Sequence, residues 1–184
     1  AASALNDLLM DKQAVGIKWP NDLLSAGSGK KIGGILTEMI IEENHVDALI
    51  IGIGINLNNK CFPADLQDLA TSVLIESKIA LRRIDVLCQV ISQFEKRSHE
   101  MTNPQQWLAQ YRAYCRTLGQ PVRVITAEGP EQTGTAIDID ANGELVIADE
   151  NGQTHTVRSG EVSIRQPHLS QDQTASRSFM PSAC

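Results

Sequence analysis

The sequence has no excess of positive charge, no long hydrophobic run and no closely spaced pair of cysteines. Its 16 Lys and Arg residues against 22 Asp and Glu give a net charge of −6, which offers little attraction to a nucleic-acid backbone or an anionic membrane. The longest apolar run, residues 48–57, is much shorter than the roughly 20 residues of a membrane-spanning helix. We therefore expect a chain that binds neither nucleic acid nor membrane.

The four cysteines, at positions 61, 88, 115 and 184, lie far apart and form no CxxC pair. No histidine stands near them at the spacing of a metal site. This usage predicts free thiols in a reducing cytoplasm.

Two glycine-bearing segments lack the residues of the common phosphate-binding motifs. GSGKK at 27–31 has no upstream glycine and no Ser or Thr after its lysine, so it is not a P-loop. GIGIN at 52–56 has no third glycine and no helix-forming run after it, which disfavours a dinucleotide-binding fold.

The start of the chain also lacks a start methionine and a basic leader followed by an apolar stretch. A helical stripe of apolar residues runs through 4–9 without an N-cap before it. We expect the chain to begin inside a domain.

What is present is typical of a folded protein. Hydrophobic residues make up 42% and charged residues 21% of the 184 residues, which suits one domain with a small appendage or two compact units. Residues 15–19 predict a strand that ends in a turn at 20–22, and a loop follows at 25–30. Apolar runs at 31–41 and 46–57 predict an antiparallel hairpin.

Helices are predicted in the middle of the chain. A short helix is expected after Pro63, and a helix of about four turns from Asp85. A third helix is expected to start with Asn103 as cap and Pro104 at its first position, and to stop at Gly119.

Beyond Gly119, five short alternating runs replace the helical period. They lie at 122–126, 133–139, 144–149, 154–159 and 162–165. Asn-Gly pairs at 142–143 and 151–152 suit tight hairpin turns in which both residues tolerate positive φ. The pattern predicts a small closed barrel, followed by a disordered Ser-, Gln- and Pro-rich tail.

Three segments place polar groups or paired glycines beside apolar strand: KWPNDL at 18–23, KKIGGIL at 30–36 and GIGINL at 52–57. Each glycine weakens a strand by roughly 0.5–1 kcal/mol relative to alanine, so these positions need a compensating reason. We expect the backbone to approach a ligand there, with Lys31 and Asp22 presenting opposite charges to it.

In this order and spacing, the three segments resemble the signature of biotin protein ligases. The resemblance covers the chain through about Arg165 and implies an α+β fold. Residues 1–117 would be part of a biotin/lipoate ligase-type catalytic domain, distantly similar to class II aminoacyl-tRNA synthetases. Residues 118–166 would be an SH3-like barrel and 167–184 a tail.

The resemblance also implies an activity and its cofactors. Biotin is activated by ATP with Mg²⁺ to biotinyl-AMP, and a lysine of a biotin carboxyl carrier domain of a biotin-dependent carboxylase then attacks the adenylate. Family members often form homodimers through the central sheet. The resemblance implies a catalytic role for Lys31 and Asp22. It implies contacts with biotin for Lys31, Gly33 and Gly34. The residues that it places at ATP are Trp19, Asn21, Asp22, Asn56 and Arg165, with Glu161 beside Arg165. Mg²⁺ would arrive with ATP, held by oxygen ligands.

The chain departs from the family in three respects: it contains no GRGRxG loop, no upstream Ser- and Thr-rich strand and no helix-turn-helix. We therefore expect little or no ligase activity from it alone.

Other interpretations stay open. One is a non-catalytic biotin- or adenylate-binding module; another is a lipoate ligase or octanoyltransferase, against which KWPNDL and the terminal barrel argue. Asp22 could simply hold an Asx turn, and Asn56 could simply end its strand. Trp107 and Tyr111 are expected in the core, and no histidine is given a catalytic role.

Overall fold

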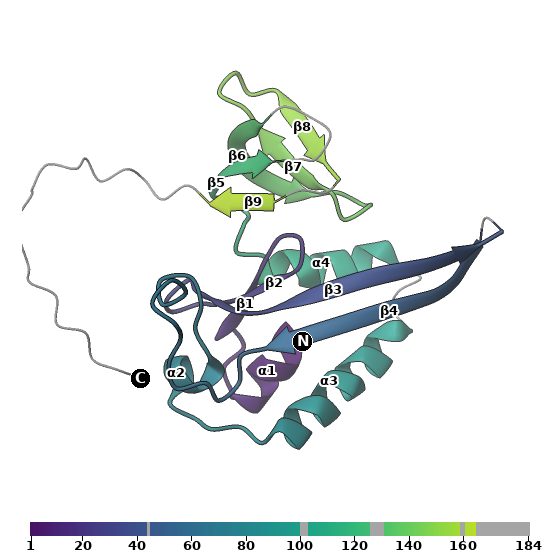
Figure 1. Ribbon diagram of the computed structural model, residues 1–184. Coiled ribbons are helices and arrows are strands. Elements are labelled where there is room, and N and C mark those ends of the chain that lie inside the picture. The colour runs from purple at the N-terminus through teal and green to yellow at the C-terminus, as the bar shows by residue number, and fades with distance from the viewer. Residues whose placement is uncertain (44, 100–102, 126–130, 159–160, 165–184) are drawn as a thin grey trace, which may run out of the picture.

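The computed structural model describes residues 1–43, 45–99, 103–125, 131–158 and 161–164 (Figure 1). The helices in these ranges are α1 (Ala2–Leu8), α2 (Val73–Ser77), α3 (Arg83–Ser98) and α4 (Pro104–Tyr114). The strands of a first sheet are β1 (Val15–Lys18), β2 (Asp22–Ser25), β3 (Lys31–Glu42) and β4 (His45–Ile55). Those of a second sheet are β5 (Pro121–Ile125), β6 (Gln132–Ile139), β7 (Leu145–Ala148), β8 (Thr154–Val157) and β9 (Glu161–Ile164).

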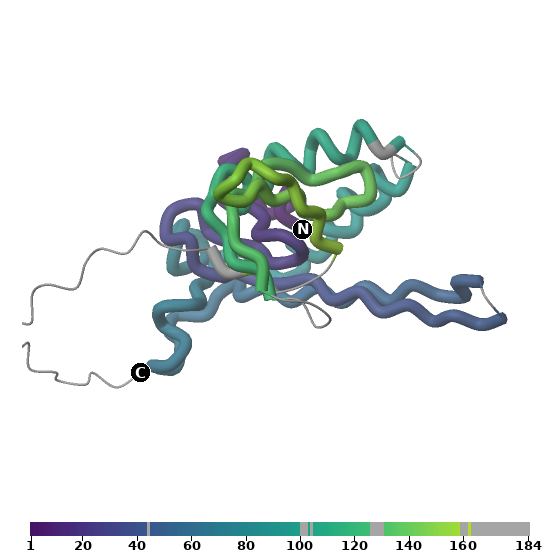
Figure 2. Tube along the Cα trace, turned by 90° about the horizontal axis from the view of Figure 1, so that it is seen from above, coloured from purple at the N-terminus to yellow at the C-terminus, as the bar shows by residue number. Residues whose placement is uncertain are grey.

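The first sheet is antiparallel throughout, in the order β1-β2-β3-β4. Its outer pair, β3 and β4, forms the predicted hairpin, which extends well beyond the rest of the molecule (Figure 2). Many apolar side chains along this hairpin are exposed, among them Leu36, Met39, Ile41 and Val46. Other parts of the described chain therefore cover little of the apolar surface of this hairpin.

One core lies where the base of this sheet meets the helices. α1 packs against both α3 and β1. The buried residues of this core are Ala2, Leu5, Val15, Leu23, Ile32, Leu57, Val73 and Val86. Asn6 is also buried; its amide donates to the carbonyls of Lys12 and Val15 and accepts from the Val15 amide, so the turn between α1 and β1 is held from inside.

The second sheet is also antiparallel, in the order β8-β7-β6-β5-β9. Its five strands confirm the five predicted runs. Among the described residues no ladder joins β8 to β9, and the five strands surround one core. The hairpin turns also differ from the expectation, because only Gly143 and Gly152 have positive φ. In each turn an aspartate, Asp140 or Asp149, accepts backbone amide bonds that close the loop.

α4 connects the two sheets and contacts both β1 and β6 (Figure 1). Leu108 of α4 is buried in the core of the second sheet, with Trp107 and Tyr111 packed against it, as expected for these aromatic residues. The helix ends at Tyr114 rather than at the predicted Gly119, and Gly119 has the positive φ of a turn.

One local expectation was wrong, and one strand was missed. The chain after Pro63 forms turns rather than a helix, and the short helix of this region is α2, further along. β2 was not predicted, because its sequence, DLLS, follows Pro20-Asn21 and does not alternate apolar and polar residues. The apolar face predicted on α3 exists, but Leu87, Ile91 and Phe94 on it are more than half exposed. The predicted tail, 167–184, lies outside the described residues.

Candidate functional site

The charged centre of the candidate site is an ion pair at the start of β3. Lys31 Nζ lies 2.7 Å from Asp22 Oδ1. The pair forms because β2 runs antiparallel to β3, with Leu24 opposite Lys31, Asp22 opposite Gly34 and an irregularity between Leu23 and Leu24. Half of the Lys31 side chain remains exposed, against 23% of Asp22, so the ammonium can still meet a ligand.

Gly34 lies directly against this ion pair. A Cβ built at Gly34 would lie 3.3 Å from Asp22 Oδ1 and 3.5 Å from Lys31 Nζ. Gly54 stands opposite Gly34 on β4, on the same face of the sheet. Facing glycines beside a charged pair make a shallow surface on which a ligand can approach the backbone closely.

Gly33 has a different neighbour. Its Cβ would meet the carbonyl oxygen of Gly54 at 2.2 Å, which no side chain could occupy without moving the strands. The glycine at this position is therefore explained by the close approach of β3 and β4, and a ligand is not needed to account for it.

Two asparagines flank the ion pair. The side-chain Nδ2 of Asn21 donates to the Ile35 backbone carbonyl (2.7 Å), and the Ile35 backbone amide donates to the Asn21 backbone carbonyl (2.9 Å). The backbone amide of Asn56 donates to the Ile32 carbonyl (2.7 Å), and the backbone carbonyl of Asn56 accepts from the Val73 amide (2.9 Å). Both asparagines are thus fixed by their neighbours on β3 within a few residues of Lys31.

The donor set suits a metal ion carried by a substrate better than one held by the protein alone. Within the described part of the chain, no group of three or more His, Cys, Asp or Glu side chains could hold a metal. Asp22 and Asn21 offer one carboxylate and one amide oxygen, and Mg²⁺ is commonly bound through one or two carboxylates together with substrate phosphates.

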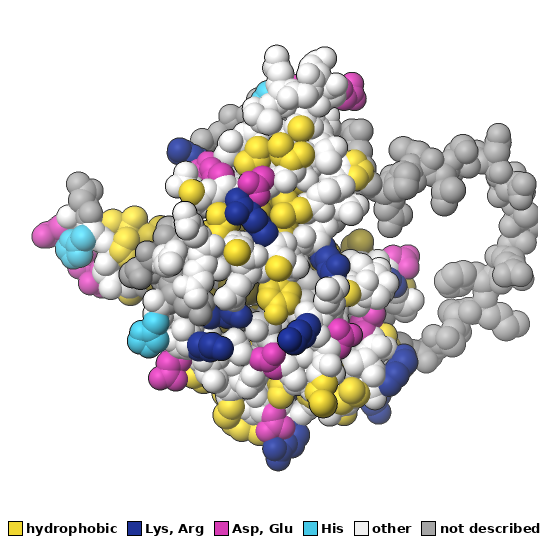
Figure 3. All heavy atoms as spheres, turned by 180° about the vertical axis from the view of Figure 1, so that it is seen from behind, with side chains coloured by type: hydrophobic (Ala, Val, Ile, Leu, Met, Phe, Trp, Pro, Cys, Tyr) yellow, Lys and Arg dark blue, Asp and Glu magenta, His cyan; other side chains and the backbone are white. Residues whose placement is uncertain are grey.

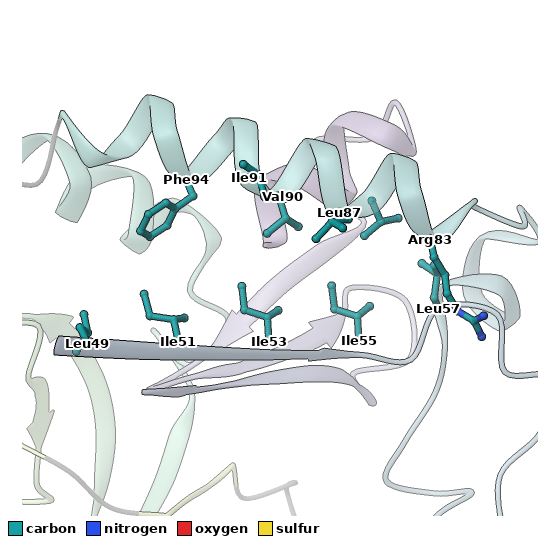
Figure 4. A pocket seen from close by; sticks show the side chains of 11 residues that line it. Leu49, Ile51, Ile53, Ile55, Leu57, Arg83, Leu87, Val90, Ile91 and Phe94 are labelled. Atoms are coloured by element: carbon teal, nitrogen blue, oxygen red, sulfur yellow. The ribbon is translucent and has the colours of Figure 1, made fainter. Parts of the chain in front are cut away.

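Away from the ion pair, an apolar groove of about 660 Å³ lies between β4 and α3 (Figure 4). Ile51, Ile53 and Ile55 point from β4 toward Val90 and Phe94 of α3 (Figure 4). Arg83 is its only charged lining residue among those described, so the groove lacks the polar groups that would orient a carboxylate or a phosphate. The polar chemistry lies instead at the ion pair.

Comparison with known families agrees with this geometry. Residues 6–56, which contain the ion pair and the glycines, match the Biotin/lipoate A/B protein ligase family, and residues 117–165 match the Biotin protein ligase C terminal domain. The chain belongs to the biotin protein ligase family. The second match decides between biotin and lipoate ligases, because it covers the sheet that follows α4, and the sequence-based recognition is confirmed.

Similar proteins include the bifunctional ligase/repressor BirA of Bacillus spizizenii, 40% identical over 142 residues, which are 74% of this chain and 42% of that protein. The biotin–[acetyl-CoA-carboxylase] ligase of Mycobacterium tuberculosis is 34% identical over 148 residues, covering 80% of this chain and 52% of that protein. This chain thus spans about half of the length of these biotin ligase relatives.

The fold agrees with solved structures of the family. The Aquifex aeolicus biotin protein ligase in complex with biotin and ATP superimposes with a TM-score of 0.74 at 25% identity, covering 90% of this chain and 67% of that one. The apo structure of the Aquifex aeolicus enzyme gives a TM-score of 0.76 at 27% identity, covering 90% and 71%. The predicted α+β fold class is therefore confirmed.

Most of the predicted biotin ligase site residues come together. Asn21, Asp22, Lys31, Gly34 and Asn56 all lie at the base of the β3–β4 hairpin. Arg165 lies outside the described residues, and of Glu161 only the backbone, in β9, is described.

Trp19 is placed differently from the expectation that it packs against the adenylate. Its side chain is 2% exposed and belongs to the core of the second sheet. The indole Nε1 donates to the Gly143 carbonyl (2.9 Å), and the Trp19 amide donates to Thr117 Oγ1 (2.9 Å). In this chain the tryptophan of KWPNDL joins the two sheets.

Sequence reasoning missed Glu76, which no local pattern distinguishes from a surface glutamate. Its carboxylate accepts hydrogen bonds from the hydroxyls of Ser25, Ser28 and Thr71. Partial burial raises the pKa of Glu76, but these bonds and the nearby charge of Lys30 outweigh it, so the pKa lies below its ordinary value.

The described residues on the face in Figure 3 form no single basic field. Lys and Arg side chains are interspersed with Asp and Glu over the face in Figure 3. None of the described helices has both the length and the apolar character needed to cross a membrane. Cys61 and Cys88 are exposed free thiols, and Cys115 is a buried one.

Proposed function

We propose that this chain forms one side of the active site of a biotin protein ligase, which uses ATP to convert biotin to biotinyl-AMP and transfers the biotinyl group to a lysine of a biotin carboxyl carrier domain. The observation that carries the proposal is the half-exposed Lys31 side chain, whose ammonium lies 2.7 Å from Asp22 and next to Gly34. Family membership, and the biotin and ATP complex of the Aquifex aeolicus relative, support it.

In the first step a carboxylate oxygen of biotin attacks the α-phosphorus of ATP, and pyrophosphate leaves. The two reactants are both anions, so they repel each other before the bond forms. Lys31 supplies a fixed positive charge between them, and that charge stabilises the transition state most because negative charge gathers there. Gly34, which has no side chain, lets biotin lie against the backbone next to that charge.

On the nucleotide side, Asn21, Asp22 and Asn56 line the place for ATP. Mg²⁺ bound to ATP would neutralise phosphate charge there, with Asp22 and Asn21 as oxygen ligands of the chain. Arg165 and Glu161, from the C-terminal unit, are proposed to complete this side. In the second step the acceptor lysine attacks the activated carbonyl carbon, and AMP leaves.

The proposed organisation is a partial catalytic domain at 1–117 and a C-terminal domain at 118–166. The acceptor is the biotin carboxyl carrier domain of a biotin-dependent carboxylase, and a homodimer and a cytoplasmic location are part of the proposal. Nucleic acid is not proposed as a ligand of this chain, given its net charge of −6.

The test is titration calorimetry with biotinyl-AMP. Lys31→Met keeps the aliphatic stem and removes the charge, so it should weaken binding by about tenfold or more, because a charge-assisted bond contributes about 1.5–3 kcal/mol. Lys96→Met, an exposed lysine of α3, should leave binding unchanged. Equal affinity of Lys31→Met and the parent chain would refute the proposed role.

A non-catalytic adenylate-binding module is the second candidate. Acceptor labelling by this chain would exclude the module, since a module would bind biotinyl-AMP without transferring biotin.

A further inference from the structure

Lys31 is held by its backbone between two parts of the chain. On one side it lies opposite Leu24 of β2, and the Ser25 amide donates to the Lys30 carbonyl (2.9 Å). On the other side the Lys31 amide donates to the Leu69 carbonyl (2.8 Å), and the Lys31 carbonyl accepts from the Thr71 amide (2.9 Å). The position of the ammonium therefore depends on how these two segments are fixed.

The carboxylate of Glu76 bonds to both segments at once. From the 25–30 loop, Ser25 Oγ donates to Oε2 (2.5 Å) and Ser28 Oγ donates to Oε1 (2.9 Å). From the 69–72 segment, Thr71 Oγ1 donates to Oε1 (2.7 Å). Ser25 and Thr71 are both buried, so water cannot easily replace the carboxylate as the hydrogen-bond acceptor of their hydroxyls.

The helix that carries Glu76 also holds Asn56. Ser72 caps α2 by accepting from the Ile75 amide (3.1 Å), and its own hydroxyl donates to the Asn59 carbonyl (2.6 Å). The first residue of α2, Val73, donates its amide to the Asn56 carbonyl (2.9 Å). One short helix thus contacts both the lysine side and the asparagine side of the candidate site.

We infer that Glu76 is a positioning residue of the ligase site: it fixes the 25–30 loop against the 69–72 segment and so holds the Lys31 backbone where the ammonium meets the carboxylate of biotin. This inference rests on the proposed function for the role of Lys31, but its structural part does not. Only a carboxylate accepts from all three hydroxyls, because an amide at the same place presents one donor group to them.

The first experiment is residue-resolved amide hydrogen exchange on the full chain with Glu76→Gln. Exchange at Lys31, Thr71 and Asn56 should rise by about tenfold relative to Val15, the amide that Asn6 holds in the same core. Thr71→Val, which removes one hydroxyl at nearly constant shape, should loosen Lys31 in the same way. Glu95→Gln, the same change at an exposed glutamate of α3, should change nothing.

Uniform acceleration at all four amides would mean that Glu76 only stabilises the fold, and would overturn the inference. Titration with biotinyl-AMP gives the second readout: Glu76→Gln should bind about tenfold more weakly than Glu95→Gln. Local loosening with unchanged affinity would overturn the link to Lys31. If the parent chain itself fails to bind biotinyl-AMP, the proposed function fails, while the exchange pattern still decides whether Glu76 positions Lys31.

Discussion

At the scale of single residues, the two adjacent glycines of β3 have different neighbours. A side chain at Gly33 would strike the Gly54 backbone at 2.2 Å, whereas a side chain at Gly34 would meet only the ends of the Asp22 and Lys31 side chains. The first contact cannot relax without moving a strand, but the second can. The same residue type therefore serves strand packing at one position and an open surface at the next.

This difference predicts opposite outcomes for two alanine substitutions. Gly33→Ala should lower the free energy of unfolding by about 1–3 kcal/mol through overpacking, as measured by urea denaturation. Gly34→Ala should leave stability within about 0.5 kcal/mol but weaken biotinyl-AMP binding by calorimetry. Gly52→Ala, whose Cβ would have 3.8 Å to its nearest neighbour, is the control and should affect neither. Reversed results for the two variants would contradict this assignment.

At the scale of elements, α2 is held to the first sheet by the carboxylate of Glu76, whose pKa is lowered. A carboxyl group with a lowered pKa in the folded chain stabilises the fold above its ordinary pKa of 4.5, and that contribution disappears as the pH falls through the lower folded value. Burial acts in the opposite direction and is outweighed by the hydroxyl bonds and by Lys30.

The parent chain should therefore exceed Glu76→Gln in stability at about pH 7, and the difference should narrow below about pH 4.5, because a protonated glutamate resembles glutamine. Urea unfolding of both proteins at several pH values measures this, with Glu95→Gln as the control. A difference that stays constant down to about pH 3 would show that the carboxylate charge is not what stabilises the contact.

The long elements were predictable because their periods are local. α3 and the β3–β4 hairpin were expected within a few residues of their observed bounds. Two short elements were missed. β2, DLLS, does not alternate apolar and polar residues, and α2, with five residues, is shorter than two helical turns. Both are fixed by hydrogen bonds to distant segments, such as those of Glu76, and short-range patterns do not report such bonds.

At the scale of the whole molecule, the two sheets share residues rather than only a linker. Trp19 is buried in the second core, Tyr111 Oη donates to the Pro20 carbonyl (3.0 Å), and Arg112 bonds to Asp138 (2.9 Å). Asn21 and Asp22 follow Trp19 directly, so the placement of these two site residues depends on the second sheet.

Trp19→Phe, which keeps most of the ring and removes the donor to Gly143, should lower the free energy of unfolding by about 1 kcal/mol. It should also speed amide exchange in β1 and β2. Trp107→Phe is the control, because among the described bonds none joins the Trp107 indole to residues 19–21. Unchanged stability and exchange in Trp19→Phe would mean that the indole bond does not couple the sheets.

The chain alone, supplied with labelled biotin, ATP, Mg²⁺ and a biotin carboxyl carrier domain, should give little or no labelled acceptor. The reason is that no segment of the sequence resembles the glycine- and arginine-rich loop that closes over the adenylate in the family. Robust labelling would show that the chain completes the site by other means.

The sequence by itself determined the family, the two long strands, the main helices and the five C-terminal strands, because motif spacing and hydrophobic period are carried by neighbouring residues. It also picked out Lys31, Asp22 and Gly34, which the fold brings together. Only the tertiary structure decided the roles of Trp19 and Glu76 and the separate reason for Gly33. Trp19 bonds to Gly143 and Thr117, which are 124 and 98 residues away along the chain, and Glu76 bonds to Ser25, which is 51 residues away. Local sequence patterns do not report contacts over such separations, so only the folded structure identifies these partners.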